Sequence, residues 1–304
     1  MYGHGYFPSR LLCTVHSLAD ALVYSSVYLS LASCAMMYIA GVLQAVPVSP
    51  ALYAIGFCIT FAIYNLNRKS DDAEDQINHA TRYRFTKRYE QPLLILSVAA
   101  YGAALVQAWG YGWTAVVITA FPLLAGLLYS FPVLPGPSRY RRLKDIPLGK
   151  NLTISSAWAV PHALLPSVLA DVVFSEMVIA TLLFFSGLVF INTVLFDMRD
   201  AGGDAAAGIR TVPVILGIAS TTRMLVATGL VLGALILVIS IPAVPLWQSG
   251  ILLFGTCYGI GYVISFTMTG ACHAVCDIVA DGQFIMIGAV LFFSDLVCSG
   301  GYLA

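Results

Sequence analysis

Charged side chains are scarce in this sequence. Asp, Glu, Lys and Arg together make up 10% of the 304 residues, whereas 59% are hydrophobic. A soluble domain has roughly a quarter of its residues charged, so this composition excludes an ordinary soluble protein. The 15 basic and 15 acidic residues cancel to a formal net charge of +0, which excludes a generally basic surface for nucleic acid. We therefore expect a polytopic membrane protein whose partners include membrane lipid and no nucleic acid.

Paired metal-binding cysteines are also missing. The seven cysteines contain no CxxC pair, and most of them lie within apolar stretches, where a cysteine is usually a small packing residue. Cys272, His273 and Cys276 lie close together but have no fourth ligand nearby, so they give only a weak indication of a metal site. The segment from Met1 to Ser9 has no basic stretch before an apolar core, and we expect no cleavable signal peptide there.

Long uncharged stretches indicate how often the chain crosses the membrane. There are 47 uncharged residues between Asp20 and Arg68, 48 between Glu90 and Arg139, and 53 between Arg223 and Asp277. One crossing needs about 20 apolar residues, so each stretch predicts two helices and a turn. Single spans over residues 151–170, 177–196 and 282–304 complete a prediction of nine transmembrane helices in one all-α membrane domain, residues 1–304.

The positions of the basic residues predict the orientation. All 15 lie at Arg10 or within residues 68–88, 139–150 and 199–223, and the turns after predicted helices one, three, five and seven have none. With nine helices, every basic segment lies on the same side of the membrane. The positive-inside rule makes that side cytoplasmic, so we expect a multi-pass protein of the cell membrane with a cytoplasmic N-terminus.

Two acidic clusters follow predicted helices two and six. Asn67, Asp71 and Asp75 are spaced four apart, and Asp197, Asp200 and Asp204 have the offsets i, i+3 and i+7, so each set lies on one helical face. The chain crosses the membrane four times between the clusters, which places both at the cytoplasmic surface. Like charges at this spacing destabilise a helix unless a cation lies between them.

The chemistry of these clusters favours magnesium and a diphosphate. Both provide oxygen ligands without nitrogen or sulfur, which suits Mg²⁺ completed by substrate phosphates better than zinc or copper. Basic side chains that can neutralise a polyanionic leaving group lie nearby. They are Arg68, Lys69, Arg82, Arg199, Arg210 and the Tyr140-Arg-Arg-Leu-Lys144 segment.

At these residues the sequence resembles the UbiA superfamily of intramembrane prenyltransferases. Asn67, Asp71 and Asp75 match the family's NxxxDxxxD motif, and Asp200 and Asp204 match its DxxxD motif within a longer similar run from Asp197 to Gly217. Tyr140 and Lys144 match the YxxxK element. The similarity in layout extends over essentially the whole chain.

The resemblance implies nine helices around a central cavity that opens to lipid, with two Mg²⁺ ions bridging a polyprenyl diphosphate. The metal ligands would be Asp71, Asp75, Asp200 and Asp204, and Asn67 would lie in the same shell. Asp197 would be a further ligand or the base for the acceptor, so Asp71, Asp197 and Asp200 are the expected catalytic residues. The expected substrate-binding residues are Asn67, Arg82, Tyr140, Lys144, Arg199 and Arg210. The allylic C–O bond would ionise in a dry pocket, with pyrophosphate released.

Three interpretations of the reaction remain open. Asn67 is followed by Arg68 where many members have Asp, and the segment from Asn78 to Phe85 lacks the prolines of the family's RPxPxG-like stretch. The acceptor is therefore unidentified and expected to be lipophilic. A UbiA-type terpene cyclase that needs no acceptor is an alternative, and a cation-coupled transporter is a third, although its coupling site would be expected near the midplane.

Several other polar residues lie near the predicted cytoplasmic face or inside spans. Asp277 and Asp281 repeat the DxxxD spacing, for which we favour a loop cap or cavity lid over a third metal site. His16 with Asp20, and Trp158 with His162, are i,i+4 pairs that either line the cavity or pack structurally. Lys150 and Asn151 open helix five as an anchor and cap, or contact substrate. Asp295 lies within the last span and needs a partner or a cavity.

Overall fold

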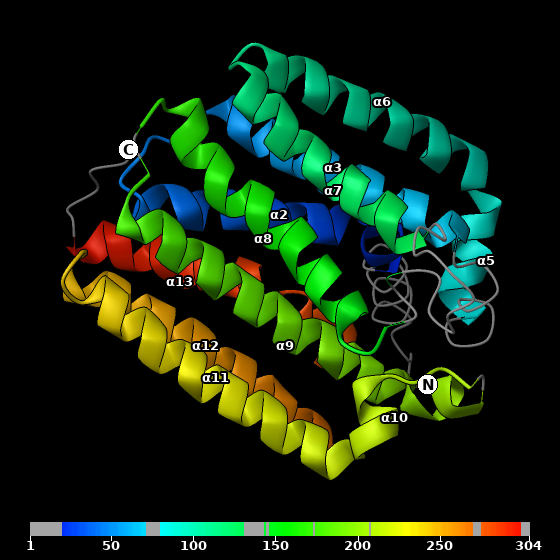
Figure 1. Ribbon diagram of the computed structural model, residues 1–304. Helices are drawn as coiled ribbons and strands as arrows, with labels where there is room; N and C mark the ends of the chain where they lie inside the picture. Colours follow the sequence, from blue (N-terminus) through cyan, green and yellow to red (C-terminus); the bar gives the residue numbers. More distant parts are fainter. Residues whose placement is uncertain are drawn as a thin grey trace, which may run out of the picture.

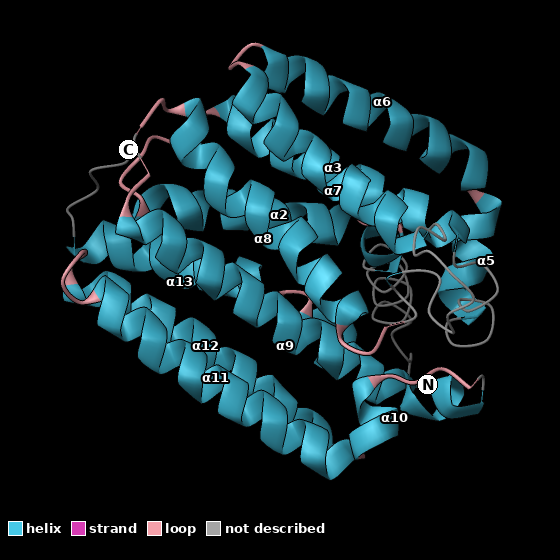
Figure 2. Ribbon diagram, in the orientation of Figure 1, coloured by secondary structure: helices cyan, strands magenta, loops and turns pink. Residues whose placement is uncertain are grey.

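The computed structural model describes residues 20–70, 80–130, 143, 146–172, 174–206, 208–269 and 275–298. Over these residues the chain consists of helices and short connections, with no β-strand (Figure 2). The predicted all-α fold class is confirmed.

Within the described ranges, six helices are long and apolar enough to cross a membrane, and three apolar helices are shorter. The long ones are α3 (Pro50–Ser70), α6 (Glu90–Trp109), α8 (Gly149–Leu169), α9 (Glu176–Ala206), α11 (Ile218–Ser240) and α12 (Leu246–Met268). The shorter ones are α2 (Val27–Leu43), α7 (Trp113–Ser130) and α13 (Gln283–Cys298). The short elements α5 (Ala80–Arg88), α10 (Val212–Leu216) and the π-helix η2 (Val275–Ala280) connect them. The protein is an integral membrane protein, and the count of nine crossings stays a prediction.

The helix boundaries differ from the predicted spans at two informative places. The predicted span 177–196 lies within α9, but the helix continues to Ala206 and carries the whole second acidic cluster in regular helical geometry. Asp20 lies on a separate helical stretch before α2. The chain turns at Ser25 and Ser26, and Ser26 has a left-handed backbone with φ 67°.

Helix α9 is the central element of the bundle. Its side chains Phe184, Phe185, Leu188 and Ile191 are fully buried, and it packs against α8 and α11 on either side (Figure 1). Because a Cβ on Gly187 would lie 2.4 Å from Leu232 Cδ2, the glycine lets α11 approach closely. A helix buried on most of its faces holds its C-terminal carboxylates rigidly.

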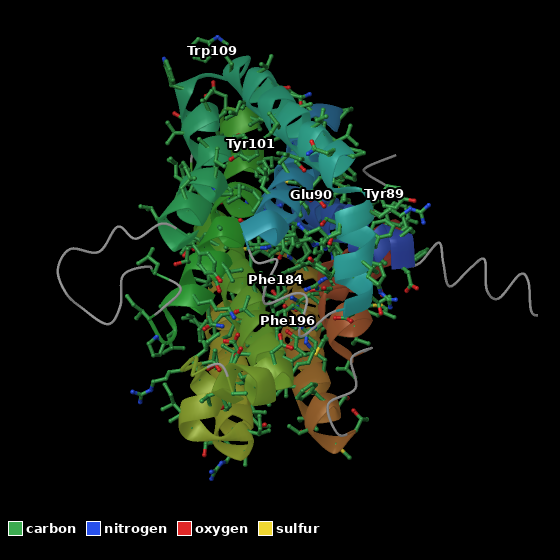
Figure 3. The ribbon with its side chains drawn as sticks, turned by 90° about the vertical axis from the view of Figure 1, so that its right-hand side faces the viewer. Tyr89, Glu90, Tyr101, Trp109, Phe184 and Phe196 are labelled. Carbon is green, nitrogen blue, oxygen red and sulfur yellow. The ribbon has the colours of Figure 1, made fainter. Side chains whose placement is uncertain are left out.

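The two ends of the bundle differ in chemistry. α5 and α10 lie at one end (Figure 1), and Figure 3 looks onto that end, with Phe196 near its middle. α6 begins at Glu90, after the basic helix α5, and runs to Trp109, which stacks edge-on against Trp113 at 4.7 Å between ring centroids. Exposed tryptophans are typical of a membrane–water interface.

Candidate active site

A cavity of about 610 Å³ lies among the helices and contains most of the described candidate residues. Its wall is formed by α2, α3, α5, α7, α8, α9, η2 and α13, which brings the end of α3 and the end of α9 together. The charged, amide and threonine side chains that line it are Asn67, Arg68, Thr81, Arg82, Lys150, Thr153, Asn192, Thr193, Asp197, Arg199, Asp200, Asp204, Asp277, Asp281 and Gln283. The convergence of the two chain regions that sequence spacing predicted is therefore present, to the extent that the structure describes them.

Asp197 is held from two sides by helix α8. Lys150 Nζ donates to Asp197 Oδ1 at 2.7 Å, and Asn151 Nδ2 donates to Asp197 Oδ2 at 2.9 Å and to Thr193 Oγ1 at 3.3 Å. The Asp197 side chain is only 2% exposed. Both oxygens of this buried carboxylate are paired, so Asp197 fixes the Lys150 ammonium at the cavity wall.

The start of α8 has a constrained backbone. Leu148 has a left-handed conformation with φ 65°, which is costly for a residue with a branched side chain. The next residue is Gly149, and a Cβ there would lie 2.9 Å from the Leu143 carbonyl oxygen. Such strain is retained where the surrounding structure requires it. Here the left-handed turn places Lys150 and Asn151, in the first turn of the helix, beside Asp197.

Arg199 links the end of α9 to the π-helix η2. Its guanidinium donates two 2.9 Å hydrogen bonds to the two oxygens of Asp200 and one of 2.9 Å to Asp277 Oδ1. Its side chain is 6% exposed and lies over the Phe196 ring, 4.9 Å from the centroid. The bidentate pair with Asp200 and the hydrogen bond to Asp277 hold two carboxylates around one guanidinium in the cavity.

Asp204 is the last carboxylate of the second acidic cluster on α9. It is buried, and its Oδ2 atom has no hydrogen-bond partner. One turn later Gly208, with φ 74°, ends the helix and the Ile209 amide donates to the Asp204 carbonyl at 2.8 Å. A buried carboxylate oxygen without a donor is costly, and a cation beside it would remove that cost.

The first acidic motif is described only at its start. Asn67 and Arg68 lie at the end of α3 and line the cavity, and Arg68 donates to the Tyr24 carbonyl. Arg82 on α5 lines the cavity as well. The predicted ligands Asp71 and Asp75 lie outside the described residues, as do Tyr140 and Lys144.

Arg210 is the predicted diphosphate contact that the described structure does not bring to the cavity. The turn at Gly208 directs the chain away from the end of α9, and Arg210 is exposed and absent from the cavity wall. Its predicted role stays a prediction.

The rest of the wall is aromatic and aliphatic. Trp158 Nε1 donates to Tyr64 Oη at 3.0 Å, and the two rings meet edge to face with centroids 5.6 Å apart. Leu29, Ile154, Val189, Phe196 and Phe284 complete this surface. A wall of this kind excludes water and presents ring faces that attract a cation.

The weaker candidates separate into two groups. Trp158, Lys150, Asp277 and Asp281 line the cavity. His162 does not, since it is buried between Ser33 Oγ at 2.6 Å and the Trp158 carbonyl at 2.5 Å. Further from the cavity, Asp20 is exposed, and Asp295 is 7% exposed on α13. Cys276 is a buried free cysteine, whereas His16, Cys272 and His273 lie outside the described residues.

The sequence matches the UbiA prenyltransferase family over residues 17–293. The chain belongs to this family. It is therefore a prenyltransferase, and the resemblance inferred from the acidic motifs is confirmed. The family match extends from before α2 into α13, so it includes every element that lines the cavity.

Solved structures of UbiA proteins share the fold at low sequence identity. The apo structure of a UbiA homologue from Aeropyrum pernix K1 has a TM-score of 0.66 and 16% identity, covering 87% of this chain and 97% of that one. A UbiA homologue from Archaeoglobus fulgidus bound to GPP and Mg²⁺ has a TM-score of 0.61 and 13% identity, covering 90% and 98%. A digeranylgeranylglyceryl phosphate synthase has a TM-score of 0.54 and 15% identity, covering 93% and 98%. No curated protein matches the sequence.

The donor atoms of this UbiA protein fit a divalent cation. The Asp204 Oδ2 atom is buried without a partner, and Asn67 lines the same cavity. Carboxylate and amide oxygens suit Mg²⁺. Within the described ranges, no group of three or more His, Cys, Asp or Glu side chains is arranged to hold a metal, so the predicted set depends on Asp71 and Asp75.

Two parts of the site were missed or underrated by sequence reasoning. Lys150 and Asn151 were treated mainly as an anchor and a cap, but they bind Asp197 across 46 or 47 residues of sequence. Asp277 and Asp281 were interpreted as a loop cap or a cavity lid, and both line the cavity. Their repeated DxxxD spacing after an apolar span was the available signal.

Proposed function

We propose that this protein transfers a prenyl group from a polyprenyl diphosphate to a lipophilic acceptor inside the membrane, in a reaction that depends on Mg²⁺. The observation that carries the proposal is the cavity itself. It joins an acidic and basic end, formed by α3, α8 and α9, to an aromatic pocket large enough for a prenyl chain. Membership of the UbiA family and similarity to a homologue bound to GPP and Mg²⁺ support it.

The diphosphate would occupy the polar end of the cavity. Two Mg²⁺ ions, held by Asp71, Asp75, Asp200 and Asp204, would neutralise the diphosphate and stabilise its departure. Lys150 is fixed by Asp197 at the cavity wall and adds a positive charge there. Arg199 is bound to Asp200, and we propose that its guanidinium also faces the diphosphate when the metals engage that carboxylate. Tyr140, Lys144, Arg82 and Arg210 remain proposed contacts.

The prenyl chain would lie along the aromatic part of the cavity. Ionisation of the allylic C–O bond leaves positive charge on the prenyl group, and the ring faces of Trp158, Tyr64 and Phe284 would stabilise it. The same side chains exclude water that would otherwise capture the cation. The acceptor nucleophile then forms a bond to the prenyl carbon, while pyrophosphate leaves.

We also propose that the polar end faces the cytoplasm. The basic helix α5 lies at the same end of the bundle as α10, and Lys150 and Arg199 line the polar end of the cavity (Figure 1). This arrangement agrees with the positive-inside rule.

The proposal is tested by pyrophosphate release from purified protein. We expect release from C10 to C20 prenyl diphosphates with Mg²⁺ and none with EDTA, and loss of release in Asp200→Asn and Asp204→Asn. A product that is a cyclic hydrocarbon or alcohol, formed without an acceptor, would support the cyclase instead. Metal-dependent flux of the lipid with its diphosphate intact would support a transporter and contradict both enzymes.

A further inference from the structure

Asp281 is a cavity carboxylate that makes no direct contact with a cation, although the charges of Arg199, Arg82 and Arg68 act on it. It lines the cavity between η2 and α13, and among the residues that the structure describes no hydrogen bond or ion pair holds its side chain. Asp197 binds Lys150, Asp200 and Asp277 bind Arg199, and Asp204, whose Oδ2 atom also lacks a partner, belongs to the proposed metal set. Asp281 is therefore a cavity carboxylate outside the proposed metal set with acceptor capacity left for a ligand.

The backbone that carries Asp281 is nevertheless held firmly. Tyr28 Oη on α2 donates to the Ile278 carbonyl at 3.0 Å, and Tyr258 Oη on α12 donates to the Val279 carbonyl at 3.0 Å. These carbonyls belong to the π-helical turn η2, and such turns frequently occur at functional sites. Two helices thus fix the turn while the carboxylate at its end stays unpaired.

Gly282 is required for this arrangement. A Cβ at this position would lie 2.1 Å from Tyr28 Oη and 2.5 Å from the Ile278 carbonyl oxygen. The glycine therefore lets α2 approach the turn directly after Asp281. Preorganisation of a single unpaired group is typical of a residue that binds a ligand rather than of a solvated cap.

Asp281 lies near the end of the cavity where the reaction would occur. Arg199 binds both Asp200 and Asp277, and Asp277 precedes Asp281 by four residues. The prenyl carbon that reacts is bonded directly to the diphosphate, so it too must lie next to Asp200. Burial, reinforced by the charge of Asp277, raises the pKa of Asp281 to about 7.

We propose that Asp281 receives the acceptor substrate, and that this acceptor presents an uncharged hydroxyl group; the inference rests on the proposed prenyl transfer. The Asp281 carboxylate accepts a hydrogen bond from the hydroxyl. As the C–O bond to pyrophosphate breaks, a lone pair of the hydroxyl oxygen forms the new C–O bond to the prenyl carbon. The hydroxyl proton passes to Asp281, and the bonding electrons leave with pyrophosphate.

This geometry selects against acceptors that carry a carboxylate. Asp277 and Asp281 make this part of the cavity negative, and the nearby cations Lys150 and Arg199 already bind carboxylates. A carboxylate placed beside Asp281 would meet the repulsion of Asp281 and Asp277, whereas a neutral alcohol gains a hydrogen bond to a charged group.

The test uses two probes that share a ring system and a hydroxyl group: 2-naphthol and 6-hydroxy-2-naphthoic acid. Binding to the detergent-solubilised protein is measured with Mg²⁺ and unreactive geranyl thiolodiphosphate, and transfer with geranyl diphosphate by mass spectrometry. The wild type should bind the alcohol at least about tenfold more tightly, the size expected for a hydrogen bond to a charged group. Asp281→Asn should lose both this preference and transfer to the alcohol. Asp281→Glu should restore part of the preference.

The control is Asp171→Asn, which changes an exposed carboxylate beyond α8 at a left-handed position that Asn tolerates. It should behave as the wild type in every assay. Two results would overturn the inference: no preference of the wild type for the alcohol, including no binding of either probe; or an Asp281→Asn protein with full transfer and preference. A different result would contradict the proposed prenyl transfer but not the acceptor site. In that case the wild type would release no pyrophosphate with Mg²⁺, yet it would bind the alcohol more tightly than the acid, and Asp281→Asn would lose this preference.

Discussion

Lys150 and Asp197 form an ion pair between neighbouring helices α8 and α9, with 2.7 Å between Nζ and Oδ1. Asn151, the next residue, binds the second carboxylate oxygen. The pair fixes the position of a cation in the wall of a cavity that is also lined by aromatic side chains, carboxylates and three arginines. It connects the fold of the bundle to the chemistry of the site.

Replacing Lys150 by Met should lower donor affinity and stability together. The substitution leaves Asp197 buried without its cation, and an unpaired polar group of this kind costs roughly 1–3 kcal/mol. We expect a lower thermal midpoint and a higher KM for geranyl diphosphate. The double variant Lys150→Met with Asp197→Leu should recover stability, because an apolar pair can replace a buried ion pair. Recovery of activity in the double variant would contradict the role given to Lys150.

Asp204→Asn should remove activity without unfolding the protein. The Oδ2 atom has no partner within the protein, so an amide at this position loses no internal hydrogen bond of that oxygen. We expect pyrophosphate release to fall by about 10²–10³-fold, the size typical of a lost transition-state contact. Circular dichroism and thermal unfolding should match the wild type. Activity equal to that of Asp171→Asn would exclude Asp204 from the metal site.

Trp158 should limit the length of the prenyl chain. Its indole binds Tyr64 and lies on the cavity wall, so Trp158→Ala enlarges the space available to the donor. We expect the ratio of C20 to C10 turnover to rise in this variant. The matched change Trp247→Ala alters a tryptophan outside the cavity wall and should leave the ratio unchanged. An unchanged ratio in Trp158→Ala would place the prenyl chain elsewhere.

Gly282→Ala should disturb the turn that carries Asp281. The new Cβ would meet Tyr28 Oη and a backbone carbonyl, and a backbone cannot yield as a flexible side chain does. We expect a lower thermal midpoint and reduced transfer to an acceptor. Gly261→Ala on α12 is the control, because a Cβ there meets nothing within 4 Å. That change should be neutral or slightly stabilising, as Ala is favoured over Gly in a helix.

Transfer to the acceptor should rise with pH around the pKa of Asp281, which burial raises to about 7. Below this pH the carboxyl is protonated and does not accept the acceptor's proton; above it the carboxylate is available. Several groups act on Asp281 or are acted on by it: Asp277, Arg199, Arg82, Arg68, Tyr28, Tyr64, Tyr262 and Cys276. We expect Asp281→Asn to lose this step in the pH profile. A profile that keeps the step would assign it to another group.

The same raised pKa makes a prediction about stability. The folded protein holds the Asp281 proton to a higher pH than the unfolded chain, whose Asp has a pKa of about 3.9. The contribution of Asp281 to stability is therefore complete below about pH 4 and is lost as the pH rises through about 7. Thermal unfolding at pH 5 and pH 8 should show a smaller decrease for Asp281→Asn than for the wild type.

Spacing alone predicted the core of the site because helical geometry is regular. Asp197, Asp200 and Asp204 lie on one helix and line one cavity, as their offsets required, and counting the crossings brought them to the same end as Asn67. The charge distribution also predicted which end of the bundle is basic. These features follow from the helical period of about 3.6 residues and from the positions of charged residues, both of which can be read in the sequence.

Contacts across the bundle could not be predicted in the same way. The partner of Asp197 is on α8, and the partner of Asp277 is Arg199 on α9, 78 residues away. Which side chains meet depends on helix rotation and on local turns such as the left-handed Leu148. The π-helical turn before Asp281 likewise has no clear signal in composition, so its carboxylates were interpreted as a cap.

The most direct test of the central claim is electron paramagnetic resonance of Mn²⁺ bound to the protein with geranyl thiolodiphosphate. The account predicts two bound Mn²⁺ ions per chain, with phosphorus hyperfine coupling from the diphosphate, and loss of bound metal in Asp200→Asn and Asp204→Asn. Bound Mn²⁺ that is unchanged in both variants, or that shows no coupling to phosphorus, would contradict a metal–diphosphate site at the end of α9.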